Sequence, residues 1–227
     1  ALRSGDAQKA RAAFERALEL SAQAYQAYAY LSGVQLAEGD KEAALASARR
    51  AVDLAPASGL ANEALATAEF YAGDLNRARQ ASEVALQASP NSAAAHLVAS
   101  DIRKAQGDLE GGLREAQLAV TLDPEFGAAW SALGMSYLAA NDLAGAQKSF
   151  SHAVALSPNL VSARTGLGVT YARQGKLAAA VEQQKAAIAL DASRAAAHNN
   201  LGAALLSQGD LSGAAREFDE AIKAQPD

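Results

Sequence analysis

The chain has 227 residues, of which half are hydrophobic but only 5% are aromatic. Alanine alone accounts for 61 residues, so the apolar content rests mainly on a small residue that favours helices and a β-rich domain is not expected. The absence of cysteine excludes disulfides, thiolate metal sites and cysteine nucleophiles, and three histidines leave little for metal chemistry.

The formal net charge is -5, and the charged residues are scattered rather than grouped. This balance argues against nucleic acid and anionic membrane surfaces as partners. The longest uncharged stretch, 20–37, is interrupted by serine and glutamine, so we expect no membrane span and a soluble chain, cytoplasmic or periplasmic. The chain begins without Met and without a signal peptide, which predicts either a removed leader or a piece of a longer protein.

A turn signal recurs along the chain every 34 residues. It usually reads Gly-Asp, with Asn-Asp and Gly-Lys as variants, and its first residues are Gly5, Gly39, Gly73, Gly107, Asn141, Gly175 and Gly209. All five prolines share one phase, seventeen residues after a turn signal. Twelve residues after each turn signal stands an alanine, without exception: Ala17, Ala51, Ala85, Ala119, Ala153, Ala187 and Ala221. Such a column predicts that two helices approach closely in every repeat.

Apolar residues at helical spacing lie on both sides of each turn signal, so every repeat is predicted to be a helix hairpin. A glycine suits a left-handed residue that ends the first helix, while aspartate caps the second and proline separates one hairpin from the next. The aspartates of the turns are therefore read as helix caps before any functional role is considered.

These residues resemble the tetratricopeptide repeat (TPR) family. One repeat carries the full family pattern, and the next carries most of it: Trp130, Leu133, Gly134, Tyr137, Ala146, Phe150 and Pro158, then Leu167, Gly168, Tyr171 and Ala180. The resemblance covers the whole chain. It implies an all-α fold, a right-handed α-α superhelix of about thirteen helices.

When the chain is divided at the repeat boundaries of this family, residues 1–24 supply only a second helix. The expected repeats are then 25–58, 59–92, 93–126, 127–160, 161–194 and 195–227. We expect one array over 1–227 without a linker or second domain. An array that begins inside a repeat and ends on a Pro-Asp turn favours a fragment of a longer array, with a second copy covering the ends as the alternative. The alanine-rich usage suggests a bacterial source.

Catalytic signals are missing from the sequence. No nucleophile elbow or P-loop is present, and Gly166-Leu-Gly168 falls within a predicted helix, where Gly168 is the family's packing glycine. His96 and His198 lie three repeats apart and are expected to be half-buried packing residues, while His152 is expected to face solvent. We therefore predict a protein that is not an enzyme and uses no cofactor or metal.

The resemblance implies that partners bind in a concave groove lined by the first helices. Carrying the family's groove positions onto this chain gives a largely apolar wall with a few polar residues: Tyr30, Leu60, Glu63, Phe70, Tyr71, Leu97, Val98, Asp101, Lys104, Met135, Leu138, Asn199 and Asn200. The Asn199-Asn200 pair is similar to an asparagine ladder of some TPR arrays, but it does not repeat here, so a solvated or capping role is the alternative.

The groove lacks the Lys/Asn/Arg clamp with which some TPR proteins hold acidic tails. Lys104 and Arg173 lie two repeats apart, and Glu63 and Asp101 would repel an acidic peptide. An amphipathic helix or an apolar segment of a partner protein suits the wall better. The alternative for residues such as Phe70 and Leu138 is that they pack the neighbouring hairpin.

Residues 59–126 depart most from the family pattern. Gln35, Glu69 and Arg103 replace its tyrosine in the first three repeats, and adjacent repeats would bring them close, so we expect a polar ladder across the first helices. This region would be the one specialised for a partner or for bending.

The sequence thus predicts a non-catalytic scaffold that holds a peptide or helical segment of a partner protein in its groove. The alternative is homotypic assembly, in which array ends or edges stack subunits on one another.

Overall fold

The computed structural model describes residues 4–225, which form thirteen helices and no strand. The all-α helical-repeat fold expected from the sequence is confirmed. The helices are α1 (Ser4–Leu20), α2 (Tyr25–Ala37), α3 (Lys41–Leu54), α4 (Gly59–Ala72), α5 (Leu75–Ala88), α6 (Ala93–Ala105), α7 (Leu109–Leu122), α8 (Gly127–Ala139), α9 (Leu143–Leu156), α10 (Val161–Arg173), α11 (Leu177–Leu190), α12 (Ala195–Gln208) and α13 (Leu211–Ala224).

The turns within the hairpins have the predicted chemistry. Glycines 39, 73, 107, 175 and 209 have φ between +76° and +90°, and Asn141 takes the same left-handed place with φ +59°. The aspartate that follows accepts a hydrogen bond from the backbone N–H three residues later in α3, α5, α7, α9 and α13, as expected for a helix cap. The first turn signal is an exception, because Gly5 and Asp6 lie inside α1.

The helices pack at two columns of small residues, one five residues after the turn signals and the other the alanine column twelve residues after them. Ala44, Ala78, Ala146 and Ala180 have no exposed surface, and Ala51, Ala119, Ala153 and Ala187 have none either. Where the column holds Gly112, an added Cβ would lie 2.6 Å from the Lys104 side chain and 3.1 Å from the Ser100 carbonyl oxygen. The columns therefore mark positions at which one helix leaves no room for a larger side chain on the other.

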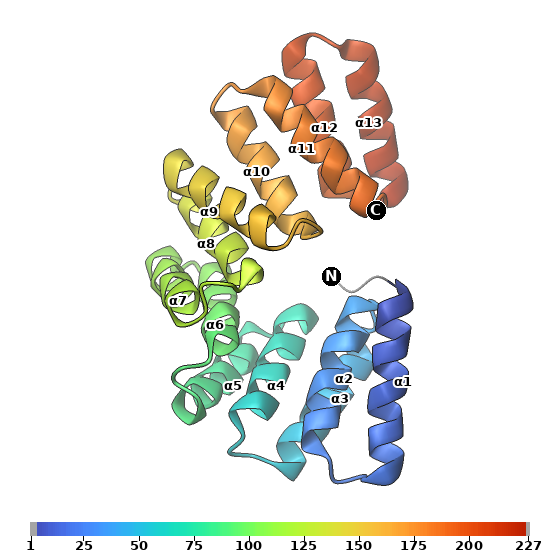
Figure 1. Cartoon of the computed structure of the whole chain (residues 1–227), viewed down its shortest axis with the longest axis vertical. Helices are drawn as coiled ribbons and strands as arrows, with labels where there is room; N and C mark the ends of the chain where they lie inside the picture. Colours follow the sequence, from blue (N-terminus) through green and yellow to red (C-terminus); the bar gives the residue numbers. More distant parts are fainter. Residues whose placement is uncertain (1–3, 226–227) are drawn as a thin grey trace. The chain divides into compact units, whose positions relative to one another are not determined.

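The chain forms two compact units, residues 1–123 and 124–227, and the expected single array over 1–227 stays a prediction. In each unit the helices pack side by side as antiparallel hairpins (Figure 1). The first helices contact one another, α2 with α4 and α4 with α6 in one unit and α8 with α10 and α10 with α12 in the other. Among the described residues, the second helices of neighbouring hairpins make no such contacts, so in each unit the first helices form the more closely spaced, inner layer.

In five repeats a side-chain hydrogen bond joins the first helix to the turn before it. The fourth residue of most first helices reaches the carbonyl oxygen six residues earlier, usually that of the inter-repeat proline. The distances are 2.8 Å for Asn62, 3.0 Å for His96, 2.7 Å for Trp130, 2.8 Å for Arg164 and 3.2 Å for His198. Four residue types (Asn, His, Trp and Arg) make this bond in five repeats, so the position requires a side-chain nitrogen at the right distance rather than one residue type.

Within the described residues, no helix combines the length and apolar character needed to span a lipid bilayer.

Replacing Asn62 with alanine should lower the free energy of unfolding. Asn62 is buried, and its Nδ2 donates to the carbonyl oxygens of Pro56 and Ser58 at 2.8 and 2.9 Å. Leaving these oxygens without the donor should cost about 1–3 kcal/mol, measured by urea denaturation followed by circular dichroism. Asn199→Ala, at an exposed asparagine of another first helix, is the matched control and should change stability by less than about 0.5 kcal/mol. Equal losses in both variants would contradict the anchoring role of Asn62.

Candidate functional site

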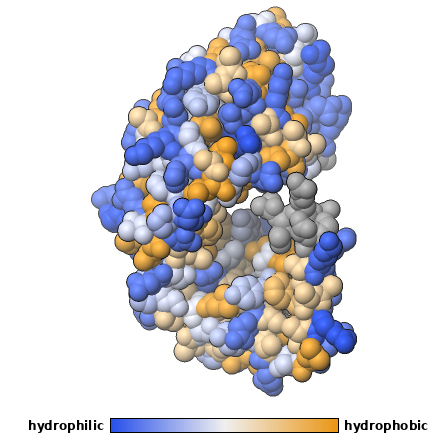
Figure 2. Space-filling view, in the orientation of Figure 1, coloured by the Kyte–Doolittle hydropathy of each residue, from blue (hydrophilic) through white to orange (hydrophobic). Residues whose placement is uncertain are grey.

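The predicted groove residues differ in how far they are exposed. Tyr30, Tyr71 and Met135 expose 51%, 53% and 47% of their surface, and Asn199 is exposed as well. The other nine are half-buried: Leu60, Glu63, Phe70, Leu97, Val98, Asp101, Lys104, Leu138 and Asn200. Apolar and polar atoms are interspersed over the face of both units that Figure 2 shows.

Several of the half-buried apolar residues pack against the core. Leu60 adjoins the cluster of Ala29, Ala51 and Ala61, while Phe70 and Val98 adjoin the cluster around Ala66 and Ile102. Leu138 packs against the cluster that contains the fully buried Phe150. These side chains therefore hold neighbouring helices together with at least part of their surface.

Two of the predicted groove charges neutralise each other. The Lys104 Nζ lies 2.8 Å from the Asp101 carboxylate, one turn earlier on α6. The aliphatic stem of Lys104 is also the neighbour that a Cβ at Gly112 would meet. Lys104 thus has a local ion pair and a packing role within its own hairpin.

The expected ladder of Gln35, Glu69 and Arg103 is wrong. The Glu69 carboxylate accepts instead from Nη2 of Arg49 on α3, at 3.0 Å. Arg103 pairs with Asp108 and Glu115, whose carboxylates lie 3.1 and 3.3 Å from it. Both contacts run to second helices or to the turn, because the eleventh residue of a first helix faces the outer layer rather than the adjacent first helix.

A cavity of about 180 Å³ opens between the first helices α2 and α4. It brings together three of the predicted residues, Tyr30 from α2 with Leu60 and Glu63 from α4. The other lining residues are small or apolar, apart from two hydroxyls: Ala29, Ser32, Gly33, Leu36, Ala64 and Thr67. The site is therefore a narrow apolar pocket with one carboxyl group in its wall.

Burial raises the pKa of Glu63 above its ordinary value, and a hydrogen bond from Ser92 opposes this rise. The Ser92 Oγ donates to Glu63 Oε2 at 3.3 Å, a long bond, and the side chain has no ion pair in the described part of the chain. Glu63 is thus an acid held in a poorly solvated place without a cation.

The two asparagines of the predicted pair line different hollows. Asn200 contributes to a cavity of about 150 Å³ between α10 and α12, together with Val169 and Arg173. Asn199 lines a hollow of about 530 Å³ beside α13, with Phe218 and Ile222. The structure therefore does not join these amides in one site.

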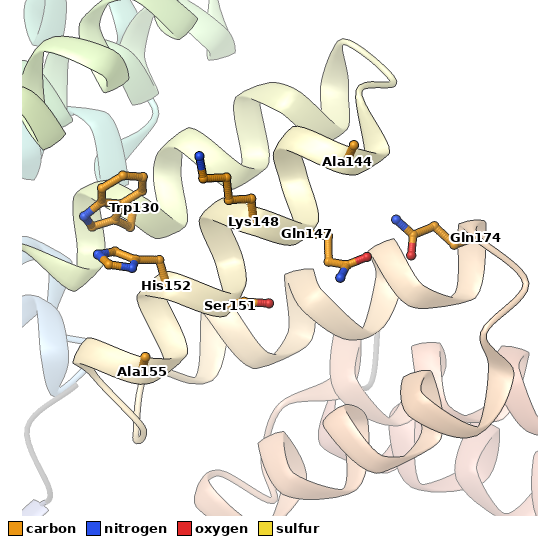
Figure 3. Close-up of a pocket in the computed structure, with 8 residues that line it drawn as sticks. All are labelled: Trp130, Ala144, Gln147, Lys148, Ser151, His152, Ala155 and Gln174. Carbon is orange, nitrogen blue, oxygen red and sulfur yellow. The ribbon is translucent and has the colours of Figure 1, made fainter.

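A larger hollow of about 730 Å³ follows α9 (Figure 3). Trp130 and His152 lie together at one end, with ring centroids 4.4 Å apart, and Gln174 lies at the other. Between them the wall is built of alanine, serine and the exposed Lys148, and Gln147 accepts a hydrogen bond from Lys176 at 3.2 Å. This open surface gathers no set of groups suited to catalysis.

The histidines have structural partners. Nδ1 of His96 lies 2.6 Å from the Glu115 carboxylate, and Nδ1 of His198 lies 2.8 Å from that of Glu217. The Nε2 atoms lie 3.0 and 3.2 Å from the carbonyl oxygens of Pro90 and Ala192, respectively. Both side chains are buried packing residues, more deeply placed than the half-buried setting expected, and within residues 4–225 no group of three potential metal ligands occurs.

Sequence reasoning missed one residue that lines the α2–α4 cavity and one neighbour of its Tyr30. Ser32 is buried, and its Oγ has no hydrogen-bond partner among the described residues. Phe14 of α1 stacks on Tyr30, with ring centroids 5.5 Å apart. A signal for the site was available in Gly33, a glycine in the middle of a predicted helix without a turn to explain it.

The antiparallel hairpins and their inner layer of first helices define a helical-repeat protein. A family profile described as tetratricopeptide repeat matches residues 1–59, 131–194 and 167–227. The chain therefore belongs to the tetratricopeptide repeat family. This family is generally a non-catalytic protein-interaction module, which supports a protein-binding role.

Solved structures share the fold at low sequence identity. The Cut9–Hcn1 hetero-tetramer of the APC/C contains a chain with a TM-score of 0.87 at 16% identity; the alignment covers 99% of this chain and 44% of that one. The present chain thus spans less than half of that relative. The Pseudomonas aeruginosa pilF structure aligns with a TM-score of 0.69 at 20% identity over 89% of this chain and 92% of its own.

YrrB, described as a TPR protein with an unusual peptide-binding site, aligns with a TM-score of 0.55 at 23% identity over 79% of this chain and 93% of its own. A search of curated proteins gives no match.

Replacing Glu63 with glutamine should stabilise the fold near neutral pH. Because the folded-state pKa is raised, the folded chain binds more protons than the unfolded chain between the two pKa values, and Glu63 lowers stability as pH rises through that range. The glutamine variant should match the native protein in stability below the unfolded pKa of about 4.3, and its advantage should grow until the pH passes the raised folded-state pKa and then stay constant. Urea denaturation from pH 4 to 8 measures the difference.

Glu83→Gln is the matched control for this measurement. Glu83 is exposed and lies 2.8 Å from Arg79 one turn earlier on α5, so its loss should cost a few tenths of a kcal/mol at pH 7. A Glu63→Gln variant that is less stable than the native protein at pH 7 would contradict the account of Glu63 as an unpaired buried acid.

Proposed function

We propose that this chain is a binding scaffold whose first helices hold a peptide or helical segment of a partner protein. Family membership supports protein binding as the general role. The finer statement rests on the inner layer that α2, α4 and α6 form in one unit and α8, α10 and α12 in the other. Peptide binding by YrrB, named in that structure's description, agrees with this mode.

The observation that carries the proposal is the exposure of large apolar side chains on first helices. Tyr30 and Tyr71 each leave more than half of their surface in water, and Leu206 and Met135 leave about half. Aromatic side chains offer a large contact area at a low entropic cost, and they dominate binding energy when they are buried by a partner. Second helices also expose leucines, so the binding experiment must compare substitutions on first helices with substitutions on second helices.

The partner segment is apolar or amphipathic rather than acidic. Lys104 already has a carboxylate partner in Asp101, and Arg173 donates one hydrogen bond to the Leu138 carbonyl oxygen. Glu63, by contrast, lies in the inner layer and has no ion pair within residues 4–225. An acidic tail would meet repulsion there.

Selection of peptides from a random 12-residue display library tests this function. Removing the inner aromatics with Tyr30→Ser and Tyr71→Ser should weaken binding of the selected peptides by about thirtyfold or more for each tyrosine that is a hot spot, because such aromatics contribute about 2 kcal/mol or more. Fluorescence anisotropy with the synthesised peptides measures the affinities.

The matched control places the same change on second helices. Leu118→Ser and Val84→Ser remove apolar side chains that are 47% and 37% exposed on α7 and α5, and they should change affinity by less than about twofold. A library that yields no binders, or peptides equally weakened by both double variants, would overturn binding on the first helices.

A second candidate function is self-association through the surface of α13. Val52, Leu86, Val120, Val154 and Ile188 occupy the equivalent place in earlier second helices and are buried or half-buried, whereas Ile222 is 65% exposed. It adjoins the hollow lined by Phe218 and Ala196. This surface has the apolar character of a helix–helix interface.

If α13 mediates self-association, the mass measured by light scattering should rise above 23.2 kDa with increasing concentration. Ile222→Lys should return the mass to that of the monomer, because a charge would be buried in the interface. Leu118→Lys, at a similarly exposed site on α7, should leave association unchanged. A monomeric mass at every concentration would remove this candidate.

A further inference from the structure

We propose that the cavity between α2 and α4 binds one basic side chain of the partner segment, with the Glu63 carboxylate as its counter-ion and the Ser32 hydroxyl as a second hydrogen-bond partner. This inference rests on the proposed binding of a protein segment and names the chemistry that the segment presents. Four features of the cavity carry it.

The first feature is an unsatisfied hydroxyl. Ser32 exposes 1% of its surface, lines the cavity, and its Oγ has no hydrogen-bond partner among the described residues. A buried polar group without a partner lowers stability, and such groups in native proteins require an explanation. An ammonium or guanidinium group carries several N–H donors, so a single such group has enough donors for a hydroxyl oxygen as well as for a carboxylate.

The second feature is an acid without a cation. The helix α2 carries no charged residue, and in α4 the other acid, Glu69, is paired with Arg49. Asp101 on α6 is paired with Lys104. Glu63 therefore differs from the acids around it in the inner layer, because among the described residues its carboxylate accepts only the long bond from Ser92.

The third feature is an empty space beside Gly33. A Cβ added to this glycine would have no heavy atom within 4 Å, whereas at Gly134 and Gly166 it would lie 2.8 and 2.4 Å from the Phe150 ring. A glycine inside a helix lowers stability relative to alanine, because it loses more backbone freedom on folding. Packing explains this cost at Gly134 and Gly166 but not at Gly33, where the missing side chain leaves the cavity open.

The fourth feature is the mouth of the cavity. Tyr30 lines it with a half-exposed ring that Phe14 supports from α1 at 5.5 Å. Leu36 and Leu60 add aliphatic walls. An aromatic ring attracts a cation over its face, and long basic side chains lay their methylene stems along apolar surface.

Size and charge favour a side chain over a free small molecule. The volume of about 180 Å³ is below the roughly 300–1,000 Å³ typical of small-molecule sites. Residues 1–123 contain sixteen acidic and twelve basic residues, so four of the five net negative charges of the chain lie in this unit. The negative electrostatic potential of this unit attracts a basic segment toward the cavity.

Titration with n-butylammonium, followed by backbone amide NMR, tests the cavity directly. The cation should shift the amide signals of Ser32, Gly33 and Glu63 in a saturable way, with an affinity about tenfold or more above that of n-butanol, which has the same stem without the charge. n-Butylguanidinium, titrated in parallel, shows which of the two head groups the cavity prefers. Equal binding of n-butylammonium and n-butanol would overturn the proposal.

Three variants locate the binding. Glu63→Gln should reduce the affinity for n-butylammonium about tenfold, to that of n-butanol. Asp101→Asn removes the same charge from a neighbouring first helix and should change it by less than about twofold. Gly33→Leu should fill the cavity and abolish both affinities while circular dichroism stays unchanged. An n-butylammonium affinity that Glu63→Gln leaves intact would also overturn the assignment.

The peptide library distinguishes failure of this assignment from failure of the function itself. Selected peptides should share one lysine or arginine, and its replacement by norleucine should weaken binding to the native protein but not to Glu63→Gln. Peptides that bind the first helices without a shared basic residue would overturn the cavity assignment and leave the binding function standing. A library without binders would overturn the function whatever n-butylammonium does.

Discussion

The close approach of the two helices in each hairpin is the contact on which the rest of this structure depends. Alanines with no exposed surface stand at the same two places in successive hairpins, and Gly112 takes one of these places where the Ser100 carbonyl oxygen comes within 3.1 Å of where a Cβ would lie. Larger side chains at these points would separate the helices and alter every later hairpin of the unit, because each repeat packs only on its neighbours. The abundance of alanine is thus a consequence of geometry.

Polar bonds at both ends of the hairpins keep this packing in register. Left-handed glycines and capping aspartates end one helix and begin the next within a hairpin. Between hairpins, the fourth residue of the first helix reaches back to the preceding turn, as Trp130 does to Pro124 and Asn62 does to Pro56. The identity of that residue varies because a nitrogen donor at the right distance is all that the bond requires.

The α2–α4 cavity departs from what the fold alone requires. Three of its residues lower the stability of the fold. Gly33 is less favourable in a helix than alanine, Glu63 is a partly buried acid without an ion pair among the described residues, and the Ser32 hydroxyl is buried without a hydrogen-bond partner there. The three departures meet in one place, whereas the polar groups around His96 and His198 are all bonded within their own hairpins and turns. Because residues that each lower the stability of the fold line the same cavity of the inner layer, we assign a ligand to that cavity.

The sequence by itself determined the repeat length, the hairpins, their turns and caps, and the family, because each depends on interactions between residues close in the chain. Only the tertiary structure decided which polar groups meet. The spacing of Gln35, Glu69 and Arg103 predicts a ladder, yet Glu69 bonds to Arg49 and Arg103 to Glu115, since side chains at that position face the outer helices. The sequence placed Glu63 in the inner layer, but its burial, its lack of a cation and the unpartnered Ser32 depend on how α4 packs on α2. A repeat fixes positions along the helices, whereas pairing depends on rotamers and on neighbours from other repeats.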